Sequence, residues 1–169
     1  MPQKKKVITV VPDLRVENAR LIFRNFTGKE GRFNPAGRRN FCVPLEKEVA
    51  DELVELGWNI KWLQPREEGD EPQAYIQVTV SYKNKPPKIM VVTDTNKTYL
   101  EESTVHVLDW AEVKTVDLII RPYTWEVNGK EGIKAYLKTM YVTLIEDEFA
   151  KKYVDVPDAA IPNLDKPGD

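Results

Sequence analysis

The chain has 169 residues, of which 41% are hydrophobic and 31% are charged, a composition typical of one globular domain with at most a tail. No apolar run approaches the roughly 18 residues that a membrane span needs, and the N-terminal MPQKKKVITVV lacks the cleavage site of a signal peptide. The single cysteine, Cys42, has no partner for an internal disulfide, which favours a reducing compartment. These features predict a cytoplasmic protein without membrane association.

The net charge of −2 divides unevenly along the chain. Residues 1–145 carry 22 basic and 20 acidic side chains, whereas residues 146–169 carry three basic and seven acidic ones. A mildly basic body with an acidic end favours a protein that binds polyanions. We expect a domain over residues 1–153 and a flexible acidic tail over residues 154–169, where three prolines accompany few bulky side chains.

Two strands and an intervening loop are the first elements expected. Residues 16–26, VENARLIFRNF, are rich in branched and aromatic side chains and predict a strand, and NFCV at 40–43 predicts another. Between them, residues 27–39 combine three glycines, a proline and several cations. This composition predicts an irregular, pliable loop that could close over a flexible strand of nucleic acid.

One α-helix is predicted at about residues 45–56. Four apolar side chains there recur at helical spacing: Leu45, Val49, Leu53 and Leu56. Pro44 suits the start of this helix, and Gly57 suits a left-handed residue at its end. The motif GWNIKWL follows, and we expect at least one of its tryptophans to pack the helix against a barrel.

The rest of the body is rich in strand signals. Four segments have the composition or alternation of strands: residues 59–63, 74–83, 88–93 and a long hairpin at 116–145. Residues 96–113 stay unassigned, and EDEFAKKY at 146–153 predicts one helical turn. About six strands and one helix, without alternation of helix and strand, predict a mainly β fold, a small Greek-key barrel.

The hairpin has a turn signal that predicts its register. Asn128-Gly129 separates two alternating segments and predicts a two-residue type I′ turn. Val127 then faces Lys130, and the same register places Ile119 opposite Lys138.

This register gives the hairpin two unlike sides. One side is aliphatic and suits a core, and the other carries rings and cations: Arg121, Tyr123, Trp125, Lys134, Tyr136 and Lys138. Gly132 opposite Trp125 leaves space over the indole for a partner or a neighbouring chain segment. Pro122 cannot donate to a ladder and predicts a sheet edge or a bulge.

The cationic aromatic side has two interpretations. Exposed rings stack on bases with roughly 1–3 kcal/mol per base, and cations beside them neutralise phosphates. Alternatively, tyrosine and tryptophan are good strand formers, and the cations keep the sheet soluble. Further candidates of the same chemistry lie in the loop and after the helix: Arg32, Phe33, Arg38, Arg39, Phe41 and Lys61.

Enzyme motifs are sparse. His106 is the only histidine, and neither a Walker-type loop nor GxGxxG is present. Nothing in the sequence places Cys42 beside His106, so a buried structural cysteine is the simpler interpretation. The acidic residues Glu67, Glu68 and Asp70 would suit a metal-dependent nuclease, but their proline-flanked loop favours a solvated turn. We predict no catalytic residue, no metal and no cofactor.

Three segments resemble bacteriophage single-stranded DNA-binding proteins, which have an OB-fold: NPAGRRNFCVPL, LGWNIKWLQPREEGDEP and VDLIIRPYTWEVNGKEGIKAYLKTMYVTL. The resemblance extends from about Leu14 to Tyr153. It implies an OB-fold-like barrel that coats single-stranded DNA without strong sequence preference, in phage replication or recombination, within the host cytoplasm. The implied binding residues are those of the hairpin face and of the loop from Arg32 to Phe41.

The resemblance also implies partners. These are single-stranded DNA, replication or recombination proteins, and further copies of the protein along the DNA. The acidic tail departs from many such proteins because it ends in KPGD rather than in a hydrophobic tip, which argues against tip-mediated recruitment. A different class stays open: a β-barrel interaction or structural module of a phage, with the aromatic face as a protein interface.

Overall fold

The computed structural model describes residues 11–145, which form nine strands, one α-helix and one 3-10 helix. The strands are β1 (Leu14–Ala19), β2 (Ile22–Asn25), β3 (Arg39–Leu45), β4 (Ile60–Leu63), β5 (Gln73–Val80), β6 (Lys88–Val92), β7 (Lys97–Leu100), β8 (Val113–Val127) and β9 (Lys130–Leu144). The helices are α1 (Lys47–Leu56) and η1 (Val105–Asp109). The predicted helical turn at 146–153 and the acidic tail lie outside the described residues.

The strands form one mixed sheet that curls into a partly open barrel. Its main order is β1-β8-β9-β5-β3-β2, with β4 beside β5 and the β6–β7 pair beside β9. β1 pairs with β8 and β2 pairs with β3, and only two residues separate β1 from β2. The bent N-terminal segment therefore links both ends of the sheet. This arrangement confirms the mainly β, OB-fold-like barrel with one α-helix.

The bend explains part of the difference in strand number. Asn18 and Phe23 have φ angles of 53° and 51°, and the pairing register shifts beside each of them. Such irregularities bend a strand, so the segment predicted as a single strand at 16–26 is divided between β1 and β2. The unassigned residues 96–113 contain β7 and η1.

The barrel interior is filled by the inward side of each strand. On β5, the buried side chains alternate with the outward ones, as the sequence pattern predicts: Ala74, Ile76, Val78 and Val80 are buried. They pack with large side chains from the rest of the sheet, among them Phe26, Phe41, Leu118, Ile120 and Met140. Burial of each such side chain stabilises the fold by about 1.5–3 kcal/mol.

The predicted helix begins two residues late and buries only part of its predicted apolar stripe. Pro44 and Leu45 belong to β3, where Leu45 is buried opposite Ala74. Within the helix, Leu53 is buried as predicted and Ala50 is buried beside it, whereas Val49 and Leu56 are exposed. Gly57 ends it in the left-handed conformation, as predicted, with φ 99°.

The tryptophan that follows the helix is a core residue. Trp58 lies directly after Gly57 and is 4% exposed, within the cluster that also contains Leu53. The expectation that one tryptophan of GWNIKWL packs against the barrel is thus confirmed.

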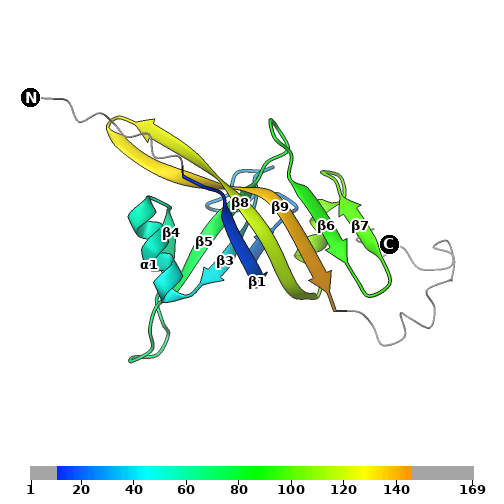
Figure 1. Ribbon diagram of the computed structural model, residues 1–169, viewed down its shortest axis with the longest axis horizontal. Coiled ribbons are helices and arrows are strands. Elements are labelled where there is room, and N and C mark those ends of the chain that lie inside the picture. The colour runs from blue at the N-terminus through cyan, green and yellow to red at the C-terminus, as the bar shows by residue number, and fades with distance from the viewer. Residues whose placement is uncertain (1–10, 146–169) are drawn as a thin grey trace, which may run out of the picture.

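The long β8–β9 hairpin extends beyond the barrel, at the opposite end of the molecule from β6 and β7 (Figure 1). Asn128 and Gly129 have φ angles of 52° and 79°, as a type I′ turn requires. The predicted register holds from Val127 opposite Lys130 back to Ile120 opposite Leu137. It fails at Ile119, which pairs with Thr139.

A bulge causes this failure, because Lys138 is an extra residue on β9 between the partners of Ile119 and Ile120. The pairing of β1 with β8 ends at Ile120. Within the described residues, Pro122 therefore has β9 on one side and no strand on the other, which agrees with its predicted place at an edge.

Candidate nucleic-acid interface

A groove opens where β5 changes its pairing partner. On the side away from β3, β5 pairs with β4 up to Ile76 and then with β9 through Thr79 and Tyr136 alone. Gln77 lies between these two pairings. The hairpin rejoins this part of the sheet through a bridge between Trp58 and Ile133.

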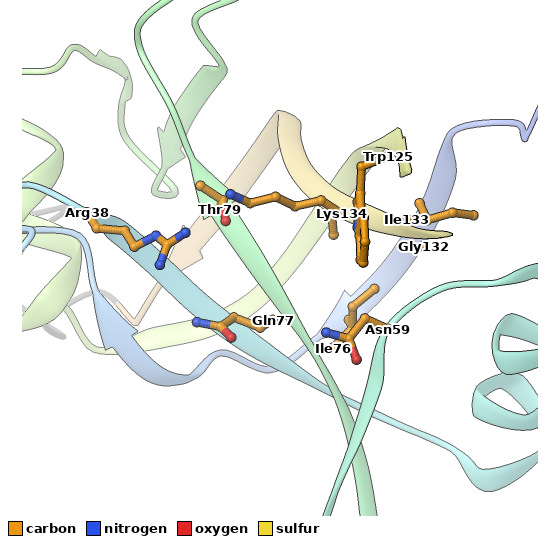
Figure 2. A pocket seen from close by; sticks show the side chains of 10 residues that line it. Arg38, Asn59, Ile76, Gln77, Thr79, Trp125, Gly132, Ile133 and Lys134 are labelled. Carbon is orange, nitrogen blue, oxygen red and sulfur yellow. The ribbon is translucent and has the colours of Figure 1, made fainter. Parts of the chain in front are cut away.

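The first part of the groove is a cleft of about 270 Å³. Its lining combines an indole, two cations and several uncharged polar groups: Arg38, Asn59, Gln77, Thr79, Trp125 and Lys134. Figure 2 shows Arg38 and Trp125 at opposite ends of this cleft, with Gln77 between them.

A second cleft of about 500 Å³ adjoins the first. Its aromatic and cationic lining residues are Arg38, Arg39, Tyr82, Lys83, Lys134 and Tyr136. The two clefts share Arg38, Thr79 and Lys134, so they form one continuous depression from Trp125 to Tyr82. We call it the β5–β9 groove.

Positive charge dominates the groove. Among the cations that line it, Arg39 is 3.5 Å from the carboxylate of Glu102, the one acidic side chain in the lining of the two clefts. Arg38 and Lys134 form no ion pair with any described residue. Unpaired cations in a groove attract the phosphates of a nucleic acid.

Tyr136 is the centre of an aromatic and cationic cluster on the hairpin. Its ring centroid is 6.0 Å from that of Tyr123, in an edge-to-face arrangement. The guanidinium of Arg121 lies 5.7 Å from the same ring and the ammonium of Lys134 lies 5.1 Å from it. These contacts hold the ring beside two positive charges.

Trp125 lies at the hairpin end of the groove and is 40% exposed. Its indole lies directly over Gly132, where an added Cβ would come within 2.8 Å of the ring atom Cζ2. The space that the missing side chain of Gly132 leaves is therefore occupied by the indole itself. The other face of the ring borders the cleft (Figure 2).

The loop at residues 27–38, predicted as a pliable segment, forms internal hydrogen bonds. The Asn34 side-chain amide donates to the carbonyls of Lys29 and Arg38 at 2.9 and 3.0 Å and accepts from Asn40 at 2.8 Å. Gly28 has φ 75°, and a Cβ there would come within 3.0 Å of Gly37. These contacts fix the backbone that carries Arg38.

The base of the loop is anchored to the 3-10 helix. The carboxylate of Asp109 accepts hydrogen bonds from the backbone nitrogens of Phe26 and Thr27, at 2.6 and 2.9 Å. The loop is thereby tied to both the barrel and η1.

The structure brings most of the predicted site residues together. Five of them line the β5–β9 groove: Arg38, Arg39, Trp125, Lys134 and Tyr136. Arg121 and Tyr123 flank the groove through their contacts with Tyr136. Lys61 reaches its floor, because its ammonium lies 2.9 Å from Oε1 of Gln77.

Four predicted residues lie elsewhere. Phe41 is 0% exposed and stacks on Phe26 in the core, so its prediction as a binding residue is wrong: its side of β3 faces the barrel interior. Lys138 forms an ion pair of 2.7 Å with Asp13 and lines neither cleft. Arg32 and Phe33 are exposed on the loop, with the guanidinium 5.3 Å from the ring, and line neither cleft of the groove.

Sequence reasoning missed several residues that line the groove: Asn59, Gln77, Thr79, Tyr82 and Lys83. The alternation of β5 places Gln77 and Thr79 on its outward side, which was the available signal. Tyr82 lies beyond the end of β5 and packs against the core, with the guanidinium of Arg39 5.6 Å from its ring centroid. Burial raises the pKa of Tyr82 to about 12.

Within the described residues, potential metal ligands do not cluster, and Cys42 and His106 lie in packed surroundings. No group of three or more His, Cys, Asp or Glu side chains within residues 11–145 could hold a metal ion. Cys42 is buried in β3, and burial raises its pKa to about 11. His106 packs edge-to-face on Trp110. None of the helices in this part of the chain is long and apolar enough to cross a membrane.

A partly open barrel with a cationic, aromatic groove across its strands is typical of OB-fold proteins that bind single-stranded nucleic acids. The family model described as "Putative phage ssDNA-binding domain" matches residues 1–169. The chain belongs to this family of phage single-stranded DNA-binding domains. No curated protein sequence matches it.

Solved structures of the single-stranded DNA-binding protein from bacteriophage Enc34 have the same fold. One is 17% identical, covers 88% of this chain and 89% of its own, and has a TM-score of 0.52. A second, in complex with ssDNA, is 16% identical with the same TM-score and covers 81% of this chain and 89% of its own.

Proposed function

We propose that the protein binds single-stranded DNA in the β5–β9 groove. The observation that carries this proposal is the continuity of the two clefts, which aligns Trp125, Lys134, Tyr136 and Arg38 along one path. Membership of the phage family and the Enc34 relative in complex with ssDNA support the choice of ligand.

The groove supplies both kinds of contact that a single strand needs. Bases stack on Trp125 and Tyr136, with roughly 1–3 kcal/mol per base. Phosphates approach the cations that line the groove: Arg38, Arg39, Lys83 and Lys134. Since every base has a stacking face and every nucleotide a phosphate, this mechanism tolerates most sequences.

Membership of the phage family also supports a proposal for the wider role. We propose that the protein coats single-stranded DNA during phage replication or recombination in the host cytoplasm, by binding alone and without catalysis. The binding domain spans residues 1–153, with residues 154–169 as an acidic tail. Replication or recombination proteins and neighbouring copies on the DNA are its proposed partners.

Salt dependence tests the electrostatic part. Binding of labelled oligo(dT), followed by fluorescence anisotropy, weakens as salt rises, with a log–log slope of about −0.7 for each phosphate neutralised. Lys134→Gln reduces the steepness of this slope by about 0.7. Lys138→Gln is the matched control on the same strand, because Lys138 pairs with Asp13 outside the groove, and it leaves the slope unchanged.

Two results would contradict the proposal. If the wild-type protein does not bind oligo(dT) at all, the groove serves the rival class of interaction modules. If Lys134→Gln and Lys138→Gln change the slope equally, the single strand follows a different path over the surface.

A further inference from the structure

A hydrogen bond from Lys61 orients the side-chain amide of Gln77. Its Oε1 atom lies 2.9 Å from the Lys61 ammonium. An ammonium has three donors and no acceptor, so the atom that faces Lys61 must be the carbonyl oxygen of the amide. The NH2 group of Gln77 is therefore held on the other side.

Gln77 belongs to the lining of the first cleft. Gln77 is exposed, projects from the outward side of β5 and has no second hydrogen-bond partner among the described residues. Figure 2 shows its amide on the floor of the cleft between Arg38 and Trp125. The floor consequently presents a hydrogen-bond donor in a defined direction.

The size and walls of the cleft suit a ligand smaller than a drug-sized molecule, with one flat face. Its volume of about 270 Å³ is below the range of about 300–1,000 Å³ that is usual for drug-sized ligands. Trp125 forms one wall and offers a face for stacking. Lys134 and Arg38 lie on the same lining and are placed for the phosphates on either side of an inserted base.

We propose that this cleft binds one base of the single strand and selects for an exocyclic carbonyl group, through the NH2 donor of Gln77. The inference rests on the proposed function, since it specifies a subsite of the same groove. Thymine, cytosine and guanine carry an exocyclic carbonyl, whereas adenine carries an amino donor. Adenine has acceptors beside its amino group only at the ring nitrogens N1 and N7, and either contact would bring that amino group toward the Gln77 NH2, so adenine is disfavoured relative to a base with a carbonyl there.

Lys61 is a positioning residue in this arrangement. It touches Gln77 and not the base, and without it the amide can rotate and present its oxygen to an adenine amino group. The discrimination between bases therefore depends on both Gln77 and Lys61, and substitution of either residue abolishes it.

The test compares equal lengths of oligo(dI) and oligo(dA), because hypoxanthine is a purine that differs from adenine by a carbonyl in place of the amino group and by a hydrogen on the neighbouring N1. Wild-type protein binds oligo(dI) about 2- to 10-fold more tightly, the effect of one neutral hydrogen bond. Gln77→Ala brings this ratio close to one, and Gln77→Glu, which keeps a partner for Lys61 but cannot donate, lowers it to one or below.

The control addresses loss of positive charge. Lys61→Met reduces the dI/dA ratio, whereas Lys47→Met, which removes a charge paired with Asp51 on α1, leaves the ratio at the wild-type value. Circular dichroism and thermal unfolding establish that each variant is folded.

A wild-type ratio of one, or a wild-type ratio retained in both Gln77 variants, would overturn this inference. Either result leaves the proposed function intact as long as oligo(dT) still binds with salt dependence. Failure of all oligonucleotides to bind would refute the proposed function as well, so the two failures are distinguishable.

Discussion

Replacement of Trp125 by alanine is the sharpest test of stacking in the β5–β9 groove. The indole lies over Gly132 on one face and borders the cleft on the other. The substitution therefore removes the aromatic wall of the cleft while leaving its cations in place. Trp110 provides the matched control, because it is 65% exposed and lies beside His106 in a separate depression formed by β6, β7 and η1.

Trp125→Ala is expected to weaken DNA binding more than it lowers the free energy of unfolding. Loss of stacking on one base costs about 1–3 kcal/mol, which corresponds to about 5- to 150-fold weaker binding of oligo(dT). The ring sits near the free end of the hairpin, where it covers Gly132 and few core atoms. The free energy of unfolding should thus fall by less than about 1 kcal/mol.

Two measurements distinguish the variants. Anisotropy with labelled oligo(dT) gives the affinity of each protein, and denaturant unfolding gives its stability. Intrinsic fluorescence adds a local signal: oligo(dT) quenches wild-type and Trp110→Ala emission, whereas Trp125→Ala loses most of the quenching. Unchanged affinity in a folded Trp125→Ala protein would refute the reasoning and remove this ring from the site.

Two further predictions concern the loop and the core. Asn34→Ala removes the hydrogen bonds to Lys29, Arg38 and the buried Asn40. It therefore lowers the free energy of unfolding by about 1–3 kcal/mol, and it weakens oligo(dT) binding because Arg38 is displaced. Wild-type stability together with wild-type affinity would contradict this prediction. The Cys42 thiol has its pKa raised from 9.0 to about 11 by burial, so stability falls as pH rises through this interval, where only the unfolded thiol ionises. Thiol reagents at pH 8 should label Cys42 only after unfolding, and rapid labelling of the native protein would disprove its burial.

Much of the local structure could be predicted because it depends on neighbouring residues. Asn128-Gly129 forms the expected turn since both residues tolerate positive φ, and the register follows from that turn for as long as the ladder is regular. The alternation of β5 follows in the same way from its own sequence.

The helix shows the limit of periodicity. Leu45 has the spacing of a helical residue but belongs to β3, because Ala74 on a strand distant in sequence pairs with it. The rest of the predicted helix formed, but with Ala50 as a buried residue where spacing favoured Val49. Which side of a short helix is covered depends on what the barrel presents to it.

The candidate site, like the helix, could be predicted from the sequence only in part. The sequence by itself determined the class of chemistry, rings and cations on one side of a type I′ hairpin, and the family resemblance that accompanies it. Only the tertiary structure decided which of those residues share a groove. A one-residue bulge at Lys138 separates this side chain from Lys134 and the groove. Phe41 is buried in the core and is therefore not part of the groove. The change of partner on β5, from β4 to β9, adds Gln77 to the site, because pairing between remote strands leaves no mark in a local pattern.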